Sequence, residues 1–558
     1  MKKYVYFLFL GFLSLRSFPQ DLNNLRDQKP FDIKGSLDVR TIGYSANGIA
    51  NRRSPLTYIL AGSPTLSIYG ISIPVSFSFS EQERSFRQPF NQFGLSPTWK
   101  WITLHGGYRN LSFSPYTLAG HTMLGGGIEL RPGKFTVAMM TGRLNRATTI
   151  DTTTGAVQPY SFSRYGTAVK IGYGTEKTFI NLSLLSAKDS EKNFKGVADS
   201  TSVRPAANTV LGGDFKVKII DNLFLFADGS LSIYTHDINS GIEIDSSVKA
   251  IQSLEKLMKL NATSEYFVAY SGGIGYKGKN FGINAAYRYV DPGFVSMGAY
   301  FFQNDLRNIT ISPSFNALKG RLRFNGSVGV QDDNRKKRKQ ASTRRIISMA
   351  NLNWDFTDKL GVDANYSNFS TNSEPTVTVI ENRYLLAQTN SNLSVSPRLI
   401  LPGQKTTQVV LLSFNQSNLK DLNEDTRQNN DIQSSVAFLN YNLTLNRLGL
   451  SLSSGLNYTL NKIASGDVSS QGVSLGASKA FLKNKLMVSS INSWVQSKME
   501  AARGDILNLG GNITYSPVKG HRLNLRISSL NNSTTREDVD ESMKFSELTG
   551  ELGYTFSF

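Results

Sequence analysis

The sequence predicts an all-β fold: a transmembrane, antiparallel, up-and-down β-barrel of about 26 strands, within a range of 22–26. Three observations predict it. Apolar and polar residues alternate with a period of two, turn-forming residues recur between the alternating stretches, and longer polar connections lie between successive pairs. The stretch 548–558 is the clearest example, because every second residue is apolar, aromatic or Gly and the residues between are small or polar.

The composition agrees with strands that have one apolar and one wet face. The chain has 558 residues, more than one soluble core usually organises, and 40% of them are hydrophobic. Beyond the first residues, no run of about 18 consecutive apolar residues occurs, which excludes spanning helices. Cysteine is absent, so we expect ring closure to supply the stability that disulfides give other secreted proteins.

The net charge is +19, which in a soluble protein would first suggest nucleic acid. No basic helix or stacking motif accompanies the charge, so no nucleic-acid partner is expected. We expect the cationic side chains to line a polar lumen and outer loops that face lipopolysaccharide phosphates. No cofactor is expected.

The start of the chain predicts export. A basic Met1-Lys2-Lys3 and the apolar run 4–15 are typical of a secretory signal peptide, here 1–20, with the cut expected between about residues 16 and 20. The alternative is a membrane anchor. A short periplasmic segment, 21–34, leaves no room for an N-terminal plug domain, so we expect 35–558 to be almost all barrel.

Two kinds of connection alternate along the chain, as is typical of outer-membrane barrels. The tight turns are rich in Gly, Asn, Asp and Pro and are expected on the periplasmic side; they are 131–133, 174–177, 220–222, 278–280, 317–320, 357–359, 402–404, 446–449, 483–485 and 517–520. The longer polar loops are expected outside; examples are 145–160, 187–206, 331–344, 418–431 and 531–543.

Counting the turns gives the number of strands. Each tight turn joins two strands, and three further pairs fit around 35–70, 71–98 and 101–130, although 22 or 24 strands stay open. Closure then requires that 548–558 pair with a strand near 35–44. A soluble sandwich has the same period, but it would not explain the signal peptide, the length and the final Phe together.

Charged residues at inward positions are the first candidates for function. Arginine rings in a wide pore favour anions, and they also hold loops that fold inwards. The plainer alternative is a solvated wall with scattered ion pairs. The candidates are Arg288, Arg321, Arg323, Arg522 and Arg526, with Glu129, Asp228 and Asp363.

Two loop segments are further candidates. The segment 246–260 has apolar residues at helical spacing and predicts either a lid against the lumen or a helix that caps its own loop. The basic run Arg335, Lys336, Lys337, Arg338 and Lys339 predicts either a solvated loop tip or a contact with anionic lipid or an acidic partner.

The segment 84–127 is the least repetitive part of the chain. It contains His105, Tyr108, Arg109 and His121, which could form a polar cluster. A catalytic histidine beside a Ser or Asp would suggest an outer-membrane hydrolase, but no acidic residue lies between Glu83 and Glu129. A structural cluster that packs a loop is therefore preferred, and two histidines are too few ligands for a metal.

The end of the chain resembles the C-terminal assembly signal of Gram-negative outer-membrane barrels, carried here by Glu551, Gly553, Phe556 and Phe558. This resemblance implies an integral outer-membrane location and insertion by the barrel assembly machinery. The glutamine near the predicted cleavage site resembles the exported proteins of Bacteroidota, in which a glutamine at this place is common. No subfamily and no cargo are implied.

Three functions follow as hypotheses. The first is a channel or translocation pore for solutes or polymers, with a basic lumen that favours anions. The second is a binding or scaffold barrel that is plugged by its own loops or by a partner subunit. The third, less favoured, is a hydrolase, so we do not expect an enzyme.

Overall fold

The computed structural model describes residues 30–558 except 82–91, 149–160, 194–202, 243–254, 256–257, 300–303, 335, 338–340, 376–386, 422–426, 501 and 537–540. The predicted signal peptide lies outside the described residues, and so does most of the predicted helix 246–260. Among the described residues, no helix is both long and apolar enough to cross a membrane.

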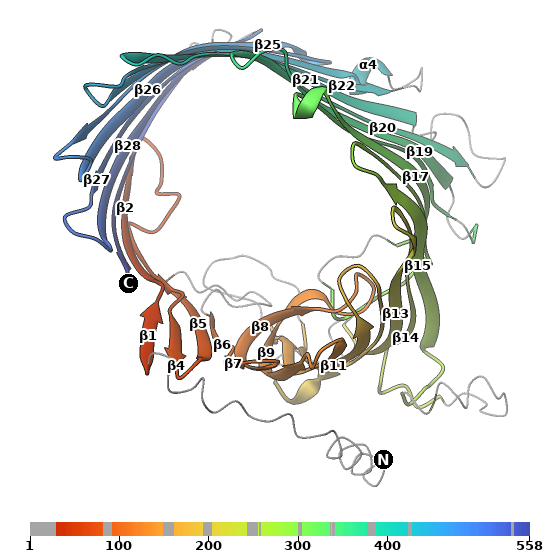
Figure 1. The fold of residues 1–558 in the computed structure, drawn as a ribbon. Coiled ribbons are helices and arrows are strands. Elements are labelled where there is room, and N and C mark those ends of the chain that lie inside the picture. Colours follow the sequence, from red (N-terminus) through yellow and green to blue (C-terminus); the bar gives the residue numbers. More distant parts are fainter. Residues whose placement is uncertain are drawn as a thin grey trace.

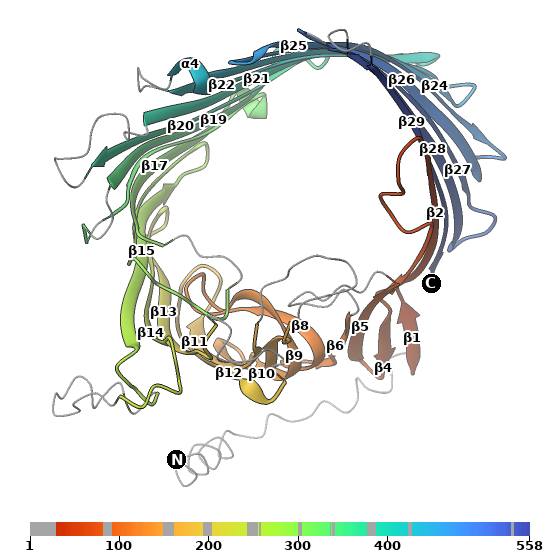
Figure 2. The same ribbon diagram turned by 180° about the vertical axis from the view of Figure 1, so that it is seen from behind.

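The described chain forms a single antiparallel sheet that closes into a ring (Figures 1 and 2). Its 29 strand segments make a closed barrel of 26 strands, because three of the barrel strands are each broken into two segments. These pairs are β1 with β2, β3 with β4, and β6 with β7, and the breaks fall at or beside Gly35, Pro64 and Pro97. The predicted fold class and strand number are confirmed.

The strands are β1 (Phe31–Lys34), β2 (Ser36–Asn47), β3 (Leu56–Gly62), β4 (Thr65–Ile68), β5 (Ile71–Ser80), β6 (Gln92–Leu95), β7 (Thr98–Trp99), β8 (Ile102–Ser112), β9 (Ala119–Leu130), β10 (Phe135–Asn145), β11 (Ser163–Gly174), β12 (Phe179–Ser190), β13 (Ala207–Ile220), β14 (Leu223–Thr235), β15 (Ser264–Lys277), β16 (Phe281–Val290), β17 (Leu306–Ala317), β18 (Leu322–Asp332), β19 (Ala341–Asp355), β20 (Leu360–Pro375), β21 (Ala387–Leu401), β22 (Thr406–Asp421), β23 (Ile432–Leu445), β24 (Leu450–Ile463), β25 (Gly466–Phe481), β26 (Leu486–Met499), β27 (Ala502–Tyr515), β28 (His521–Arg536) and β29 (Glu541–Ser557). Short helical turns are η2 (Glu191–Asn193), η3 (Leu318–Gly320) and α4 (Arg427–Asn430).

The first and last strands close the ring. β2 pairs with β29 from Ser36↔Ser557 to Asn47↔Ser546. Beyond the strand ends, Gly35 and Phe558 exchange two backbone hydrogen bonds, of 3.0 and 3.1 Å. The pairing predicted for 548–558 is confirmed, and it leaves neither strand with an unpaired edge at this seam.

The tight turns gather at one end of the barrel, here called the turn end, and the longer connections at the other, here called the loop end. Both described termini, at β1 and β29, lie at the turn end. The predicted alternation of short turns and longer loops is confirmed.

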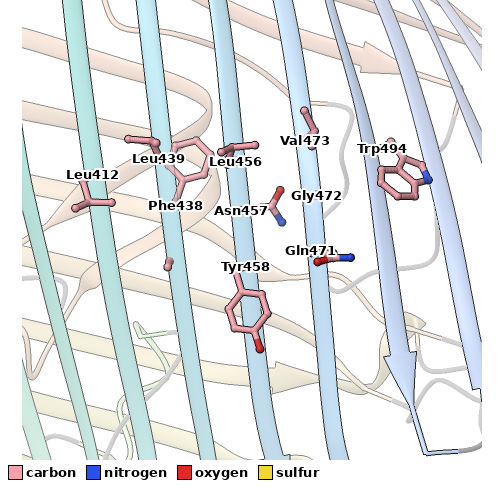
Figure 3. A pocket seen from close by; sticks show the side chains of 11 residues that line it. Leu412, Phe438, Leu439, Leu456, Asn457, Tyr458, Gln471, Gly472, Val473 and Trp494 are labelled. Carbon is pink, nitrogen blue, oxygen red and sulfur yellow. The ribbon is translucent and has the colours of Figure 1, made fainter.

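The outer face of the wall is apolar. Residues that lie opposite each other in an antiparallel ladder point to the same face, so the register joins them into rows around the barrel. One such row, across β22–β26, is Leu412, Leu439, Leu456, Val473 and Trp494. Figure 3 shows these side chains on successive strands, where they line a shallow groove.

A row of glycines crosses the wall at β6, β8, β9, β10 and β11. Its members pair in order as Gly94, Gly107, Gly125, Gly142 and Gly166. A Cβ atom on Gly125 would lie 1.9 Å from the carbonyl oxygen of Thr141, and one on Gly142 would lie 2.4 Å from that of Leu124. The backbones therefore approach too closely here for any side chain.

Candidate functional site: the lumen

Two loop-end connections fold back into the barrel and lie against its inner face. Inner loop 1 is the β8–β9 connection, 113–118, and inner loop 2 is the first part of the β16–β17 connection, 291–299. Figure 1 shows loops inside the ring on the β8–β14 side. The two loops bind each other, because the Ser296 hydroxyl donates to the Thr117 carbonyl at 2.5 Å and the Ala119 N–H donates to the Gly298 carbonyl at 2.9 Å.

Polar side chains of the wall hold inner loop 1. Lys170 Nζ on β11 donates to the Phe113 carbonyl oxygen at 3.1 Å. The Ser114 hydroxyl donates to Asp228 Oδ1 on β14 at 2.9 Å. Asp228, a predicted lumen residue, therefore serves as an anchor for this loop.

Inner loop 2 is held in the same way. The Ser232 hydroxyl on β14 donates to the Val295 carbonyl at 2.6 Å. Asn208 on β13 accepts from the Met297 N–H at 2.9 Å and donates to Ser232 Oγ at 2.8 Å. A fully buried amide with both its oxygen and its nitrogen bonded fixes the loop in one position.

Between the loops and the wall lies an apolar core. Tyr116 and Phe294 meet edge to face, with ring centroids 6.2 Å apart, and both are buried. The guanidinium of Arg288 lies 5.8 Å from the centroid of the Tyr116 ring. Arg288, predicted to face the lumen, does so, but it lies against the inner loops. The other buried members include Leu118, Met123, Met140, Leu144, Leu185, Val210 and Met297.

A charged contact stabilises inner loop 2 at its first residue. Lys336 Nζ lies 2.9 Å from Asp291 Oδ1, and this carboxylate also accepts from the Val268 N–H and the Tyr289 hydroxyl. Burial alone would raise the pKa of Asp291, but these donors outweigh it and hold the pKa below its usual range. Of the predicted basic run, Lys336 thus contacts a loop of its own chain; Lys337 is described without such a contact, and Arg335, Arg338 and Lys339 lie outside the described residues.

The other inward arginines near the turn end lie beside acidic groups. Arg321 lies 2.7 Å from Asp358, and Arg323 lies 3.8 Å from Asp355. Asp363 and Asp355 both bind Arg398, which the sequence analysis did not single out. On β21 it lies opposite Gly361 and diagonal to Asp363 of β20, which is a consequence of register that a single sequence does not reveal.

The seam carries a balanced set of charges. Arg526 lies directly opposite Glu551, and Arg522 lies opposite Thr555, which donates a 2.9 Å hydrogen bond to Asp38. The connection 48–55 leans over the same inner face, where Arg52 lies 3.6 Å from Glu547. Charges of both signs therefore share this sector.

The remaining inner face is much more exposed. Met123 and Met140, beneath the inner loops, are 0% exposed, whereas the inward Met349 on β19 and Met487 on β26 are each 47% exposed. Inward Ile491 is 63% exposed. The described inner loops thus cover the β8–β17 side of the lumen, and the β19–β27 side remains accessible.

The predicted polar cluster is spread over the wall. His105 faces inwards near the turn end, whereas His121 is buried near the loop end, six residues away along β9 from the partner of His105. Arg109 faces inwards and donates to the Pro74 and Leu95 carbonyls and to Ser76. Tyr108 lies on the outer face, in edge contact with Phe93.

His105 instead joins a serine and a carboxylate. Its Nδ1 lies 2.8 Å from Ser96 Oγ and its Nε2 lies 3.5 Å from Glu129 Oε1, while Glu129 also binds Arg131 at 2.6 Å. Hydrolases of this type stabilise an oxyanion with free N–H donors, but the Ser96 N–H is bonded to the Pro74 carbonyl. Ser96 lies at the break between β6 and β7, so these contacts brace a broken strand.

The four residues of the assembly signal occupy both faces of β29. The rings of Phe556 and Phe558 are tilted against each other with centroids 5.2 Å apart, and the His521 ring is tilted against Phe556 with centroids 4.7 Å apart. Glu551 and Gly553 alternate with them on the lumen side. Within the described ranges, no group of three or more His, Cys, Asp or Glu residues could hold a metal.

No known protein family matches the sequence, and no curated protein is significantly similar to it. Among solved structures, the P pilus usher (PapC) translocation pore is 10% identical over 94% of this chain and 99% of that chain, with a TM-score of 0.40. OccK2 (OpdF) of Pseudomonas aeruginosa is 10% identical over 94% and 98%, with a TM-score of 0.29. BauA, the ferric preacinetobactin receptor of Acinetobacter baumannii, is 9% identical over 94% and 81%, with a TM-score of 0.36.

Proposed function

We propose that this protein is an outer-membrane channel, a wide pore for solutes or polymers. The observation that carries the proposal is the contrast among inward methionines: Met140 is 0% exposed under the inner loops, but Met487 is 47% exposed on the opposite wall. Barrels of 16–18 strands already hold an aqueous channel. A larger ring with one accessible side therefore leaves room for a wide path.

The faces of the wall support a membrane location. An apolar outer row and a mixed polar inner face suit a barrel in a lipid bilayer. We place the chain in the outer membrane, with its signal peptide removed, its loops facing lipopolysaccharide and its assembly dependent on the barrel assembly machinery. A Bacteroidota source would fit the resemblance at the start of the chain.

The test is electrical. The purified protein, and a variant lacking 246–260, are inserted into planar bilayers. We expect stable currents larger than those of a porin of 16–18 strands in the same salt, because the ring is wider. If neither protein gives a current, the proposal of a channel is contradicted.

The same measurement addresses ion preference. The anion preference predicted from the arginines remains a prediction, and the acidic neighbours of Arg321, Arg323 and Arg398 weaken it. We therefore expect a reversal potential near zero in a salt gradient. A strongly anion-selective pore would show that the arginines outweigh their acidic neighbours.

A scaffold barrel that holds a partner subunit is the alternative. Its support is the exposed inward Ile491, an apolar side chain that a partner could cover. Capture of one partner in equal amounts from the membrane, together with absence of current, would favour the scaffold.

A further inference from the structure

One part of the accessible side, formed by β22–β27, differs chemically from the rest of the lumen. Between the two rims of the barrel, every second residue of β22–β27 faces the lumen. The parts of these strands between the rims are 407–417, 434–444, 451–461, 468–480, 487–497 and 504–514. None of their inward-facing residues is charged. We call this surface the uncharged wall.

This lack of charge is not a property of the whole chain, whose net charge is +19. Elsewhere in the lumen the inner face carries Lys170, Asp228 and Arg288 under the inner loops, and Asp38, Arg40, Arg526 and Glu551 at the seam. Charged groups thus occupy the sectors that the described loops cover or lean over, and they also occupy β19–β21, where Asp355, Asp363 and Arg398 form ion pairs. The uncharged wall is the rest of the accessible side, on β22–β27.

The wall presents amides and hydroxyls. Its inward residues are mainly Asn, Ser, Thr and Gly, for example Asn440, Asn457 and Asn508. An amide side chain offers donors and an acceptor, and a hydroxyl offers both in one atom. Several already bond each other across strands, as Thr444 does with Ser451 at 3.1 Å and Asn508 with Ser493 at 3.3 Å.

Such a surface discriminates among polymers. A polyanion or polycation would lose water along the wall without meeting an opposite charge. A polymer of hydroxyl groups can exchange its hydrogen bonds with water for bonds to the wall with a small net gain of about 1 kcal/mol for each bond. Many weak, equivalent contacts hold a chain near the wall and still let it move.

We propose that the uncharged wall is the contact surface for a neutral, polyhydroxylated polymer, that is, a glycan without acidic groups. This proposal rests on the pore function proposed above. It narrows the cargo from solutes in general to one chemical class.

The experiment measures single-molecule blocks of the current. A neutral glucan oligomer is compared with polyethylene glycol of equal hydrodynamic size, which lacks hydroxyls along its chain, and with dextran sulfate. We expect the glucan to dwell longest in the wild-type pore. The double variant Asn440→Leu/Asn457→Leu should shorten its dwell time by roughly five-fold per amide removed.

Asn492→Leu is the matched control. Asn492 lies on β26 between Leu475 and Leu509, on the outer face, and donates to Ser490 at 3.1 Å. The same substitution there should leave every dwell time unchanged.

The outcomes separate the two proposals. Without current in the wild type, the pore itself fails, and the glycan proposal fails with it. With current, equal dwell times for glucan and polyethylene glycol overturn the glycan proposal and leave the pore intact. Longer dwell of dextran sulfate, or of an unfolded polypeptide added as a fourth probe, would assign the wall to a different cargo.

Discussion

At the scale of single residues, function depends on which inward side chains have partners within the barrel. Arg288 would be a free cation in an empty lumen, but it lies over the ring of Tyr116. Lys336 would be a solvated loop lysine, but it binds the buried Asp291. These two charges therefore position loops.

Asp291 gives a prediction about pH. Its pKa is held below its usual range, so the stabilisation is fully present above the unfolded value of about 3.9 and is lost as pH falls through the lowered pKa. We expect inner loop 2 to loosen only below about pH 4, which would appear as increased current noise in bilayers titrated from pH 7 to 3. Asp291→Asn should show no such acid step; an identical step in this variant would assign it to another group.

At the scale of elements, the glycine row lets the backbones of β6 and β8–β11 lie close together. Removing the side chains lets neighbouring backbones approach more closely than Cβ atoms allow. The sheet can thus curve here without losing its ladder.

We predict that Gly125→Ala destabilises the barrel, because the new Cβ would lie 1.9 Å from the Thr141 carbonyl oxygen. Overpacking of this kind costs about 1–3 kcal/mol or more, so the urea midpoint should fall. Gly511→Ala is the control, since no heavy atom lies within 4 Å of its added Cβ. Equal midpoints for the two variants would show that the close approach is relieved without cost.

At the scale of the whole molecule, closure joins residues more than 500 positions apart. The Thr555 hydroxyl donates to Asp38 Oδ2 at 2.9 Å, across a sequence separation of 517. Each of the 26 barrel strands, with β1 and β2 counted as one, then pairs with a neighbour on each side, as a wall in lipid requires.

The seam can be tested by cross-linking, because the native chain contains no cysteine. Asp38→Cys/Thr555→Cys should form a disulfide under mild oxidation, detected by mass spectrometry of the linked peptides. Asp38→Cys/Thr549→Cys should not, since residue 549 lies six positions along β29, about 20 Å away. Cross-linking of the second pair alone would show that β2 and β29 pair in a different register.

The sequence by itself determined the wall of this protein, whereas the tertiary structure decided what lies inside it. Alternation with a period of two is a local property, so the turns, the number of strands and the closing pair 35–44 with 548–558 could all be predicted. The inner loops could not, because the contact of Ser296 with Thr117 spans 179 residues and depends on both loops reaching the same inner face. The pairing of Arg398 with Asp363 likewise depends on register. Local physics fixes which residues face the lumen, and only the closed ring fixes which of them meet.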